Sequence, residues 1–385
     1  MPFQTFLSKN HLSNSRQTKG LIPREDNSII IKFSGDNFGG IQIHILLGKL
    51  NYIIRTYKKA CRTIYIVFYD TFKPRDKMTY ILLEYIICML YKEYGYVIDV
   101  YAKQCMTTID TAGLKGSLLD GLMSGNMLMQ DFCRQFEKKL YYYHFRRVIK
   151  KDDDSFAISN LMFDVKHYLT NVAISPDDAA RIAEIVSELT DNACEHAGSD
   201  CLVDIDIPQE FYKAKDDLTG EYYSVNICVI NFSDSCLGDN LKNKILNKRY
   251  KKHSRYDQLN EAYKNHKKFF DKKYNEDCFF MISTFQNKIS GRDRETETGG
   301  KGLTQLLTEL ETNICNGYVL SGGKIIVFKP ELIEYNDGGW VGFNKEKDFI
   351  NIIPDDEVID YSETYLNGTG YNLTLIYRRQ EDGRK

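Results

Sequence analysis

The sequence has few of the features that mark disordered or fibrous proteins. Its 385 residues include only 7 Pro and one Trp, and it shows no internal repeat and no low-complexity tract. With 43% hydrophobic and 27% charged residues, the composition is that of a folded chain that can bury a sizeable core. Much of that core is expected to come from the 27 Tyr and 21 Phe.

An excess of charge of one sign and a long hydrophobic run are also missing. The formal net charge is -2, which argues against a protein that binds nucleic acid or membranes over its whole surface but says nothing about a local patch. No uncharged apolar run approaches the roughly 20 residues that span a bilayer. The first 20 residues lack the apolar core of a signal peptide. We therefore expect a cytoplasmic protein with no membrane partner.

Cysteine pairs at metal-binding or redox spacing are absent. The ten Cys occur singly, with no CxxC and no Cys/His cluster, at positions 61, 88, 105, 133, 194, 201, 228, 236, 278 and 315. Disulfide frameworks belong to small secreted domains. We interpret these residues as reduced, buried thiols.

The N-terminal part predicts a small α/β domain behind a flexible arm. Residues 1–27 are polar and basic and are expected to be irregular. Over 28–103, strands and helices alternate as βαβαβ, with the strands "SIIIKFSG", "RTIYIVFYD" and "YVIDVYA". Such alternation implies right-handed crossovers and a mostly parallel sheet.

The remaining chain predicts a connector and a larger second domain. Residues 104–156 are interpreted as a helical connector. The charged stretch from Arg146 to Asp154 suits an exposed boundary, and the linker is placed near 150–156. Residues 157–378 then run as helix, strand pair, basic helical insert at 242–274, glycine-rich turn, helix and closing strands, and 379–385 form a tail. The length also favours two domains.

A helix over 175–197 carries the first candidate site. Ser175 before Pro176, with acidic residues in the first turn, is typical of a helix start. Ile182, Ile185, Val186, Leu189 and Ala193 recur at helical spacing and are expected to be buried. Glu188 and Asn192 are four residues apart, so they stand one above the other on a second face. A carboxylate there can polarise water, and an amide oxygen one turn on can ligate Mg²⁺; without further support, a solvated helix face is the simpler interpretation.

Three further stretches follow in order. The strand "VNICVI" ends in Asn231 and a small-residue turn, and Asn231 can bond one edge of a base. In "ETETGGKGLTQLL", Gly299, Gly300 and Gly302 precede a helix whose free N–H groups suit an anion, with Lys301 adding charge. Gly368 and Thr369 are expected to begin the last strand. No GxxxxGK[ST] phosphate loop is present, and "SGGK" at 321–324 is interpreted as a turn.

In this order, "ELTDNA" at 188–193 and the three other stretches resemble the sequence boxes of the gyrase, heat-shock chaperone, histidine kinase and mismatch-repair ATPases, usually called GHKL. The first box of type II topoisomerases reads E-x-x-D-N-A, which "ELTDNA" matches. The resemblance implies a Bergerat-type α+β sandwich: a mixed sheet of about four or five strands, covered by helices on one face, with the nucleotide beneath a lid.

The resemblance also implies roles for individual residues. Glu188 would be the general base and Asn192 the Mg²⁺ ligand. Asn231 would take the place of the aspartate that binds the adenine amino group. The phosphate-facing turn would consist of Gly299, Gly300, Lys301 and Gly302, with Thr369 supplying a hydroxyl near the phosphates.

One box departs from the family pattern. The family's D-x-G-x-G reads "NFSDS" here, so Asn231 replaces the aspartate, and Ser233 and Ser235 replace the glycines. A neutral amide accepts a weaker hydrogen bond than a carboxylate. Asp234 is an alternative equivalent of the aspartate, while Ser233 remains among the expected nucleotide-binding residues.

These residues favour an ATP- and Mg²⁺-dependent regulatory switch with slow ATPase activity, acting on a protein partner or as a homodimer. A histidine kinase is disfavoured because His167 lacks an acidic neighbour, and the chain ends soon after the closing strand, leaving no transducer or client domain. An anti-sigma-type protein serine kinase is an alternative, since 28–103 matches the element order of the STAS-type domains on which such kinases act. A degenerate, non-catalytic interaction module is another.

The basic insert at 242–274 contains about a dozen Lys and Arg against three acids, interleaved with Tyr and Phe. A basic face with aromatic residues can bind a phosphate backbone and stack on bases. We expect either an acidic or nucleic-acid partner here, or a solvated helical insertion that packs on the domain.

Overall fold

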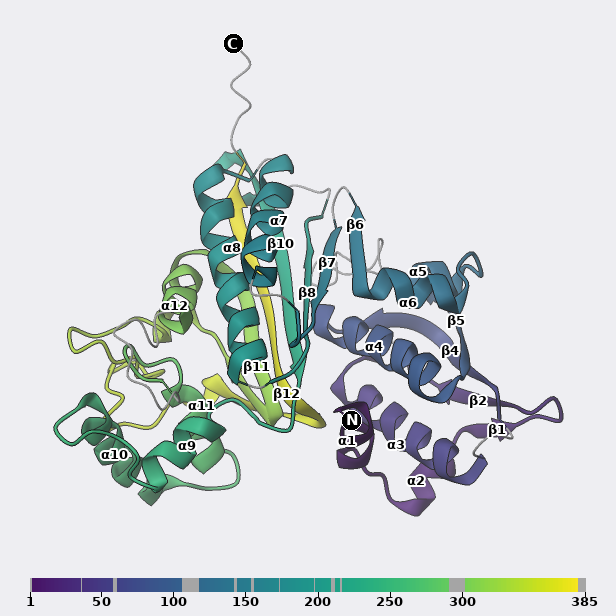
Figure 1. Cartoon of the computed structure of the whole chain (residues 1–385), viewed down its shortest axis with the longest axis horizontal. Coiled ribbons are helices and arrows are strands. Elements are labelled where there is room, and N and C mark those ends of the chain that lie inside the picture. The colour runs from purple at the N-terminus through teal and green to yellow at the C-terminus, as the bar shows by residue number, and fades with distance from the viewer. Residues whose placement is uncertain are drawn as a thin grey trace, which may run out of the picture. The chain divides into compact units, whose positions relative to one another are not determined.

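The computed structural model describes most of the chain (Figure 1). The described residues are 2–35, 37–57, 61–105, 118–141, 144–153, 156–172, 174–196, 198–208, 212–214, 217–290 and 302–379. They fall into two compact units: the first comprises residues 1–148, 204–209 and 362–367, and the second 149–203, 210–361 and 368–385.

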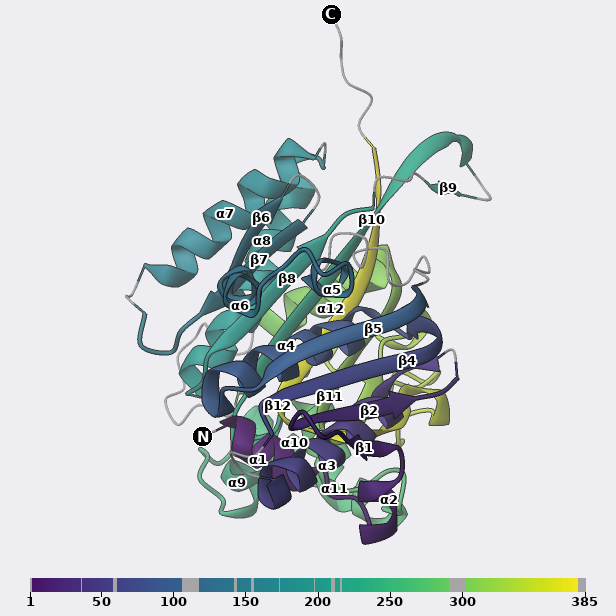
Figure 2. The same ribbon diagram turned by 90° about the vertical axis from the view of Figure 1, so that its right-hand side faces the viewer.

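The first unit contains the expected parallel strands. Its sheet consists of β1 (Leu21–Pro23), β2 (Ser28–Phe33), β3 (Asn37–Phe38), β4 (Thr63–Pro74) and β5 (Val97–Cys105). β4 pairs in parallel with β2, β3 and β5, and β1 lies antiparallel to β2 (Figure 2). The crossovers are α3 (Gly40–Tyr57) and α4 (Lys77–Tyr94). The βαβαβ order predicted for 28–103 is therefore confirmed.

The N-terminal arm is not irregular, contrary to expectation. Residues 2–23 form α1 (Pro2–Lys9), α2 (Asn14–Thr18) and β1. The side chains of Phe3 and Phe6 are fully buried, and both rings contact Tyr85 of α4. Burial of these two aromatic side chains stabilises a segment whose polar composition alone predicts no structure.

The predicted helical connector is wrong in its second half. After α5 (Leu118–Met123) and α6 (Met129–Glu137), the chain forms an antiparallel pair, β6 (Lys138–Tyr141) and β7 (His144–Ile149). Aromatic residues favour strands, and this segment reads "KKLYYYHF". Arg146, expected at an exposed boundary, is completely buried.

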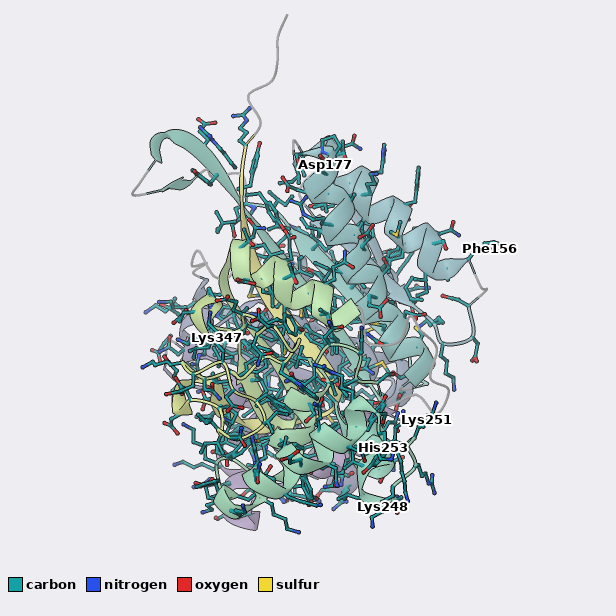
Figure 3. The ribbon with its side chains drawn as sticks, turned by 90° about the vertical axis from the view of Figure 1, so that its left-hand side faces the viewer. Phe156, Asp177, Lys248, Lys251, His253 and Lys347 are labelled. Atoms are coloured by element: carbon teal, nitrogen blue, oxygen red, sulfur yellow. The ribbon has the colours of Figure 1, made fainter. Side chains whose placement is uncertain are left out.

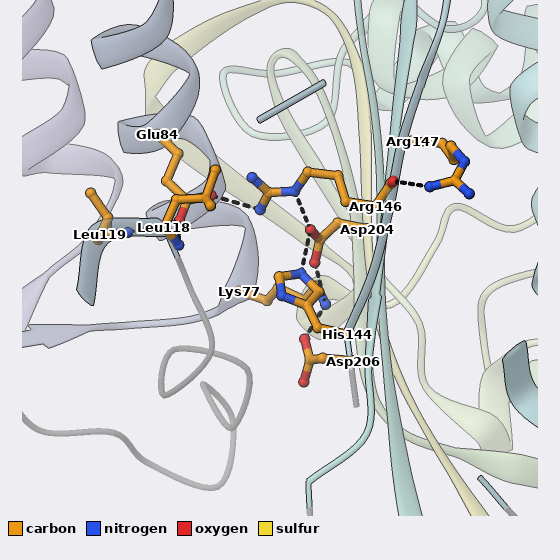
Figure 4. Close-up of polar contacts among 9 residues, drawn as sticks. All are labelled: Lys77, Glu84, Leu118, Leu119, His144, Arg146, Arg147, Asp204 and Asp206. Carbon is orange, nitrogen blue, oxygen red and sulfur yellow. Dashed lines mark hydrogen bonds and ion pairs between the residues drawn. The ribbon is translucent and has the colours of Figure 1, made fainter. Parts of the chain in front are cut away.

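Arg146 belongs to a buried ionic network in the first unit (Figure 4). Its guanidinium lies 2.6 Å from Glu84 Oε2 and pairs with Asp204. Lys77 pairs with Asp204 at 2.7 Å and with Asp206. Burial by itself raises the pKa of Asp204, but the charges of Arg146, His144 and Lys77 hold it well below its usual range. Pairing of this kind is what permits charged groups in an apolar interior.

The second sheet has the strand order β11-β12-β10-β8-β7-β6, with β9 beside β10, so the described residues give it seven strands where four or five were expected. Its further strands are β8 (Cys201–Asp206), β9 (Tyr212–Ala214), β10 (Asp217–Phe232), β11 (Ile314–Val327) and β12 (Ile359–Arg378). β10 and β12 pair antiparallel from Tyr222 opposite Arg378 to Phe232 opposite Gly368. The described residues thus form an α+β fold with two sheets, the first of them mixed.

Helices of the second unit pack on this sheet and on each other. α8 (Pro176–Asp191) contacts α7 (Ala157–Asn171), α12 (Gly302–Asn313) and β10 (Figure 1). The basic insert is helical, as expected. The remaining elements are the π-helix η2 (Asn192–His196), the helices α9 (Asp239–Leu246), α10 (Arg255–His266) and α11 (Glu276–Ser283), and the 3₁₀ turns η3 (Lys267–Phe269), η4 (Pro330–Leu332) and η5 (Asp356–Val358).

Within the described part of the chain, no helix has both the length and the apolar character that crossing a membrane requires. The eight Cys whose side chains the structure describes are free, as predicted. Six of them are buried, but Cys194 and Cys236 are half-buried, so the prediction of buried thiols is wrong for these two.

Replacing Arg146 with Met is expected to lower the free energy of unfolding by about 3–5 kcal/mol, because Glu84 and Asp204 would remain buried beside an uncharged side chain. Arg147→Met is the matched control: its half-buried guanidinium lies over the Phe145 ring and should cost much less. Urea unfolding of both variants measures the difference. Equal losses would show that the network contributes no more than ordinary packing.

His266 is expected to make stability depend on pH. It is fully buried, with Nε2 2.8 Å from the Phe349 carbonyl and Nδ1 accepting from the Tyr274 hydroxyl, and burial lowers its pKa to about 4. In the unfolded chain His266 takes up a proton near pH 6.5, whereas in the folded chain it does so only near pH 4. The free energy of unfolding therefore falls by about 3 kcal/mol as the pH is lowered from about 6.5 to 4. The test is to measure the unfolding midpoints of the wild type and of His266→Gln across this pH range. If the midpoints of both proteins change with pH in parallel, His266 is not the source of the pH dependence.

Candidate functional site

The helix that carries the first candidate residues forms as the sequence predicts. The Ser175 hydroxyl accepts a hydrogen bond from the Asp178 N–H at 3.0 Å, and Pro176 occupies the first turn of α8. The five apolar residues predicted to face the core are all buried: Ile182, Ile185, Val186, Leu189 and Ala193. The helix is thereby fixed in rotation, which decides where its polar face points.

Glu188 and Asn192 stand on this polar face, one turn apart. The Asn192 backbone N–H donates to the Glu188 carbonyl, so the helical winding is unbroken between them. Both side chains are half-buried. From Asn192 onward the helix widens into η2, and π-helical turns of this kind occur frequently at functional sites.

The pairing of α8 with α12 places Glu188 relative to the start of α12. Arg181 Nε lies 3.1 Å from Glu309 Oε2, and one turn further along α8 the Gln305 amide donates to Glu184 at 2.6 Å. The residue numbers rise along α8 while they fall along α12, so the two helices are antiparallel. Continued by one more turn along both helices, this register would bring Glu188 level with the start of α12 at Gly302.

The start of α12 is the expected anion site. The first N–H groups of a helix have no partner within it and carry partial positive charge. Gly302 is the first residue of α12, as the predicted helix start requires. The expected phosphate-facing residues Gly299, Gly300 and Lys301 lie outside the described residues.

Asn231 and Thr369 are brought together by the pairing of β10 with β12. They are directly opposite each other, and the Thr369 N–H donates to Asn231 Oδ1 at 2.8 Å. Gly368 has φ +120°, and a Cβ there would lie 2.3 Å from the Asn231 carbonyl oxygen. Only glycine allows the two backbones to approach this closely. Gly368 and Thr369 lie within β12 and do not begin it, contrary to expectation.

Two serines extend this contact into a chain of hydrogen bonds. The Asn231 amide donates to Ser199 Oγ, just after η2, at 3.1 Å. On the other side, Ser321 of β11 bonds the Gly368 carbonyl at 2.6 Å, and its Oγ lies 3.1 Å from Thr369 Oγ1. Ser321 begins "SGGK", which is part of β11 and not the turn that was expected. Ser199, Asn231, Thr369 and Ser321 are thus connected.

Ser233 has a local structural role. Its side chain is buried, and its hydroxyl bonds the Ser235 carbonyl at 2.7 Å. The close approach that the family's glycines would permit occurs instead at Gly238, where φ is +97° and a Cβ would lie 2.7 Å from the Phe280 backbone. The turn after β10 is therefore compact although Ser233 and Ser235 replace glycines.

Sequence reasoning missed Ser199, Ser321, Glu184 and Gln305. The two serines lie in short polar stretches with no recognisable motif, and their partners are 32 and 48 positions away in sequence. The Glu184–Gln305 contact joins positions 121 apart. This contact depends on the register of α12 against α8, which the sequence alone does not show.

Gly368→Ala is expected to destabilise the protein strongly, because it disrupts the close contact between β12 and β10 at Asn231. Gly35→Ala is the control, because Gly35 also has positive φ (+95°) but a Cβ there would meet no atom within 4 Å. The control should cost about 1–2 kcal/mol of backbone strain, and Gly368→Ala should cost more, since its Cβ also collides with the Asn231 backbone. Thermal unfolding of both variants provides the comparison. Equal shifts would show that the strands can separate at no cost.

Comparisons with known proteins add no assignment. No family model matches the chain, and neither the search of curated proteins nor that of solved structures returned a match. The function therefore has to be argued from the arrangement of Glu188, Asn192, Asn231 and Thr369.

Proposed function

We propose that the chain binds Mg-ATP and hydrolyses it slowly, with Glu188 as the general base. The observation that carries the proposal is the antiparallel register of α8 against α12, given by the Arg181–Glu309 and Glu184–Gln305 contacts. Continued by one turn, this register would place Glu188, one turn before Asn192, beside the start of α12 at Gly302. A phosphate held by the first N–H groups of α12 would lie beside the Glu188 carboxylate. Glu188 would accept a proton from water as the water oxygen bonds to the γ-phosphorus and the bond to the β-phosphate oxygen breaks.

The residues fit a magnesium ion that arrives with the nucleotide. Mg²⁺ prefers oxygen ligands, and it is usually held by one or two side chains together with phosphate oxygens and water. Asn192 offers an amide oxygen on a half-buried, polar helix face. Among the described residues no group of three or more His, Cys, Asp or Glu could hold a metal, so the nucleotide phosphates would have to supply the other ligands of the ion. The ion would neutralise phosphate charge.

The base of the nucleotide is assigned to Asn231, at the corner that it forms with Thr369, and the Thr369 hydroxyl keeps its expected place near the phosphates. Each end of the Asn231 amide makes one hydrogen bond, to Thr369 and to Ser199. An asparagine amide has a second N–H and a second lone pair, which leaves one donor and one acceptor for a base edge. The side chain is 4% exposed, so a base would approach it along its edge.

The fold is proposed to be of the Bergerat type. Supporting this are the packing of α8 against α7, α12 and β10, and the chain order of the four site stretches. In such a fold, nucleotide binding and release would switch the conformation of the chain and so its affinity for a protein partner or a second copy.

Glu188→Gln is expected to keep Mg-ATP binding but to lower turnover by roughly 10²–10⁴-fold, the usual contribution of a general base. Asn192→Ala should weaken binding of a non-hydrolysable ATP analogue only when Mg²⁺ is present. Isothermal titration with and without Mg²⁺ and a phosphate-release assay measure both effects.

The control is Asp177→Asn, an exposed acid in the first turn of the same helix, which should leave both measurements unchanged (Figure 3). Equal turnover in wild type and the Glu188 variant would remove the assigned base. If Asn192→Ala binds the ATP analogue as the wild type does, with and without Mg²⁺, Asn192 is not a ligand of the ion.

A second candidate is a non-catalytic interaction module. It is favoured because both ends of the Asn231 amide already bond within the protein, which leaves fewer donors and acceptors for a base. Absence of any thermal shift with millimolar ATP analogue and Mg²⁺ would support this candidate against the first.

A further inference from the structure

The basic insert carries a large local excess of positive charge. Between residues 242 and 274 the chain has twelve Lys and Arg against three Asp and Glu, a local charge of +9. Because the whole chain carries -2, the rest of it carries -11. Such asymmetry, which the small net charge hides, is the electrostatic pattern of a surface that binds polyanions.

The structure separates the cations that stabilise the fold from those that do not. Lys242 pairs with Glu276 and Asp277, and Lys273 pairs with Asp356. Lys244 is buried and bonds the Tyr256 hydroxyl at 3.0 Å. Arg255 lies 3.8 Å from the centre of the Trp340 ring. These four side chains have partners within the second unit.

The loop between α9 and α10 contains cations that do not pair with another described part of the fold. Its exposed side chains are Lys248, Arg249, Lys251, Lys252 and His253, and none of them makes an ion pair with the described residues. In Figure 3, Lys248, Lys251 and His253 project into solvent at the same edge of the second unit. We call residues 248–253 the basic loop.

The backbone of the basic loop is held in place. The Arg249 N–H donates to the Lys244 carbonyl at 2.9 Å, and the Ser254 hydroxyl bonds the Lys251 carbonyl. The Tyr250 ring stacks on Tyr256 at 5.8 Å with an angle of 27°. Lys248 and His253, near the two ends, have φ of 54° and 60°. An ordered loop presents its cations at a lower entropic cost than a disordered one.

We propose that the basic loop binds the phosphate backbone of a nucleic acid. Protein interfaces are depleted in Lys at their centre and rely on buried apolar or aromatic anchors. The basic loop has four cations on an ordered backbone, and within 248–253 no large apolar side chain is exposed. Insertion into a membrane would likewise need an apolar face. Closely spaced cations without an apolar centre suit a regular row of phosphates.

The test is fluorescence anisotropy of the full chain with a labelled mixed-sequence oligonucleotide, single-stranded and duplex. Four phosphate contacts predict that affinity falls on the order of a hundredfold between about 50 and 200 mM salt. The quadruple variant Lys248→Glu, Arg249→Glu, Lys251→Glu and Lys252→Glu should bind at least about tenfold more weakly and lose most of this salt dependence. The corresponding Gln variant should show the same direction with a smaller effect.

The matched control reverses four exposed cations of the first unit, Arg16, Lys19, Arg55 and Arg62, to Glu. It changes the net charge equally and should bind as wild type does. Both variants should keep the wild-type thermal midpoint and Mg-ATP binding, so failure here is distinct from failure of the proposed ATP site. Three outcomes would overturn the proposal. The first is that the wild type does not bind the oligonucleotide, and the second is that both variants weaken binding equally. The third is that the loop binds polyglutamate or phosphatidylserine vesicles but not the oligonucleotide.

Discussion

The close approach of β12 to β10 at Gly368 is the constraint on which the candidate site depends. Any side chain at that position would collide with the carbonyl of Asn231. Because the strands meet there without a side chain between them, Thr369 falls opposite Asn231 and their polar groups pair. The serines on either side, Ser199 and Ser321, then complete the hydrogen bonding of a corner that is mostly buried. A buried polar network is stable only when its members are satisfied in this way.

The helix layer is tied to the same strand by Glu309. This buried carboxylate of α12 pairs with Arg181 of α8 and accepts a hydrogen bond from the Tyr377 hydroxyl of β12 at 2.6 Å. Burial, followed by the neighbouring Glu309 charge, raises the pKa of Tyr377, which therefore stays a neutral donor. One strand thus positions Thr369 at one end and, through Tyr377 and Glu309, sets the register of α12 against α8. The relation of Glu188 to Gly302 follows from that register.

Local patterns in the sequence predicted the elements whose signals are local. The cap at Ser175, the buried stripe of α8 and the alternating strands and helices of 28–103 were all recognisable from spacing. The N-terminal arm was misjudged because the stability of α1 comes from Phe3 and Phe6 packing on a helix far along the chain. Arg146 was misjudged because its counter-charges, Glu84 and Asp204, are 62 and 58 positions away. For the site, Glu188 and Asn192 came from one motif, whereas their surroundings depend on strand register, which a single sequence does not reveal.

The division of the first unit into three chain segments has a consequence for synthesis on the ribosome. Lys77 and Arg146 are translated well before Asp204, their shared counter-ion. Asn10, completely buried, receives its hydrogen-bond partner Tyr365 only after 355 further residues have been translated. The N-terminal unit of a nascent chain therefore cannot reach its final form first, as such units usually do. Its completion has to wait until its third segment, residues 362–367, has emerged.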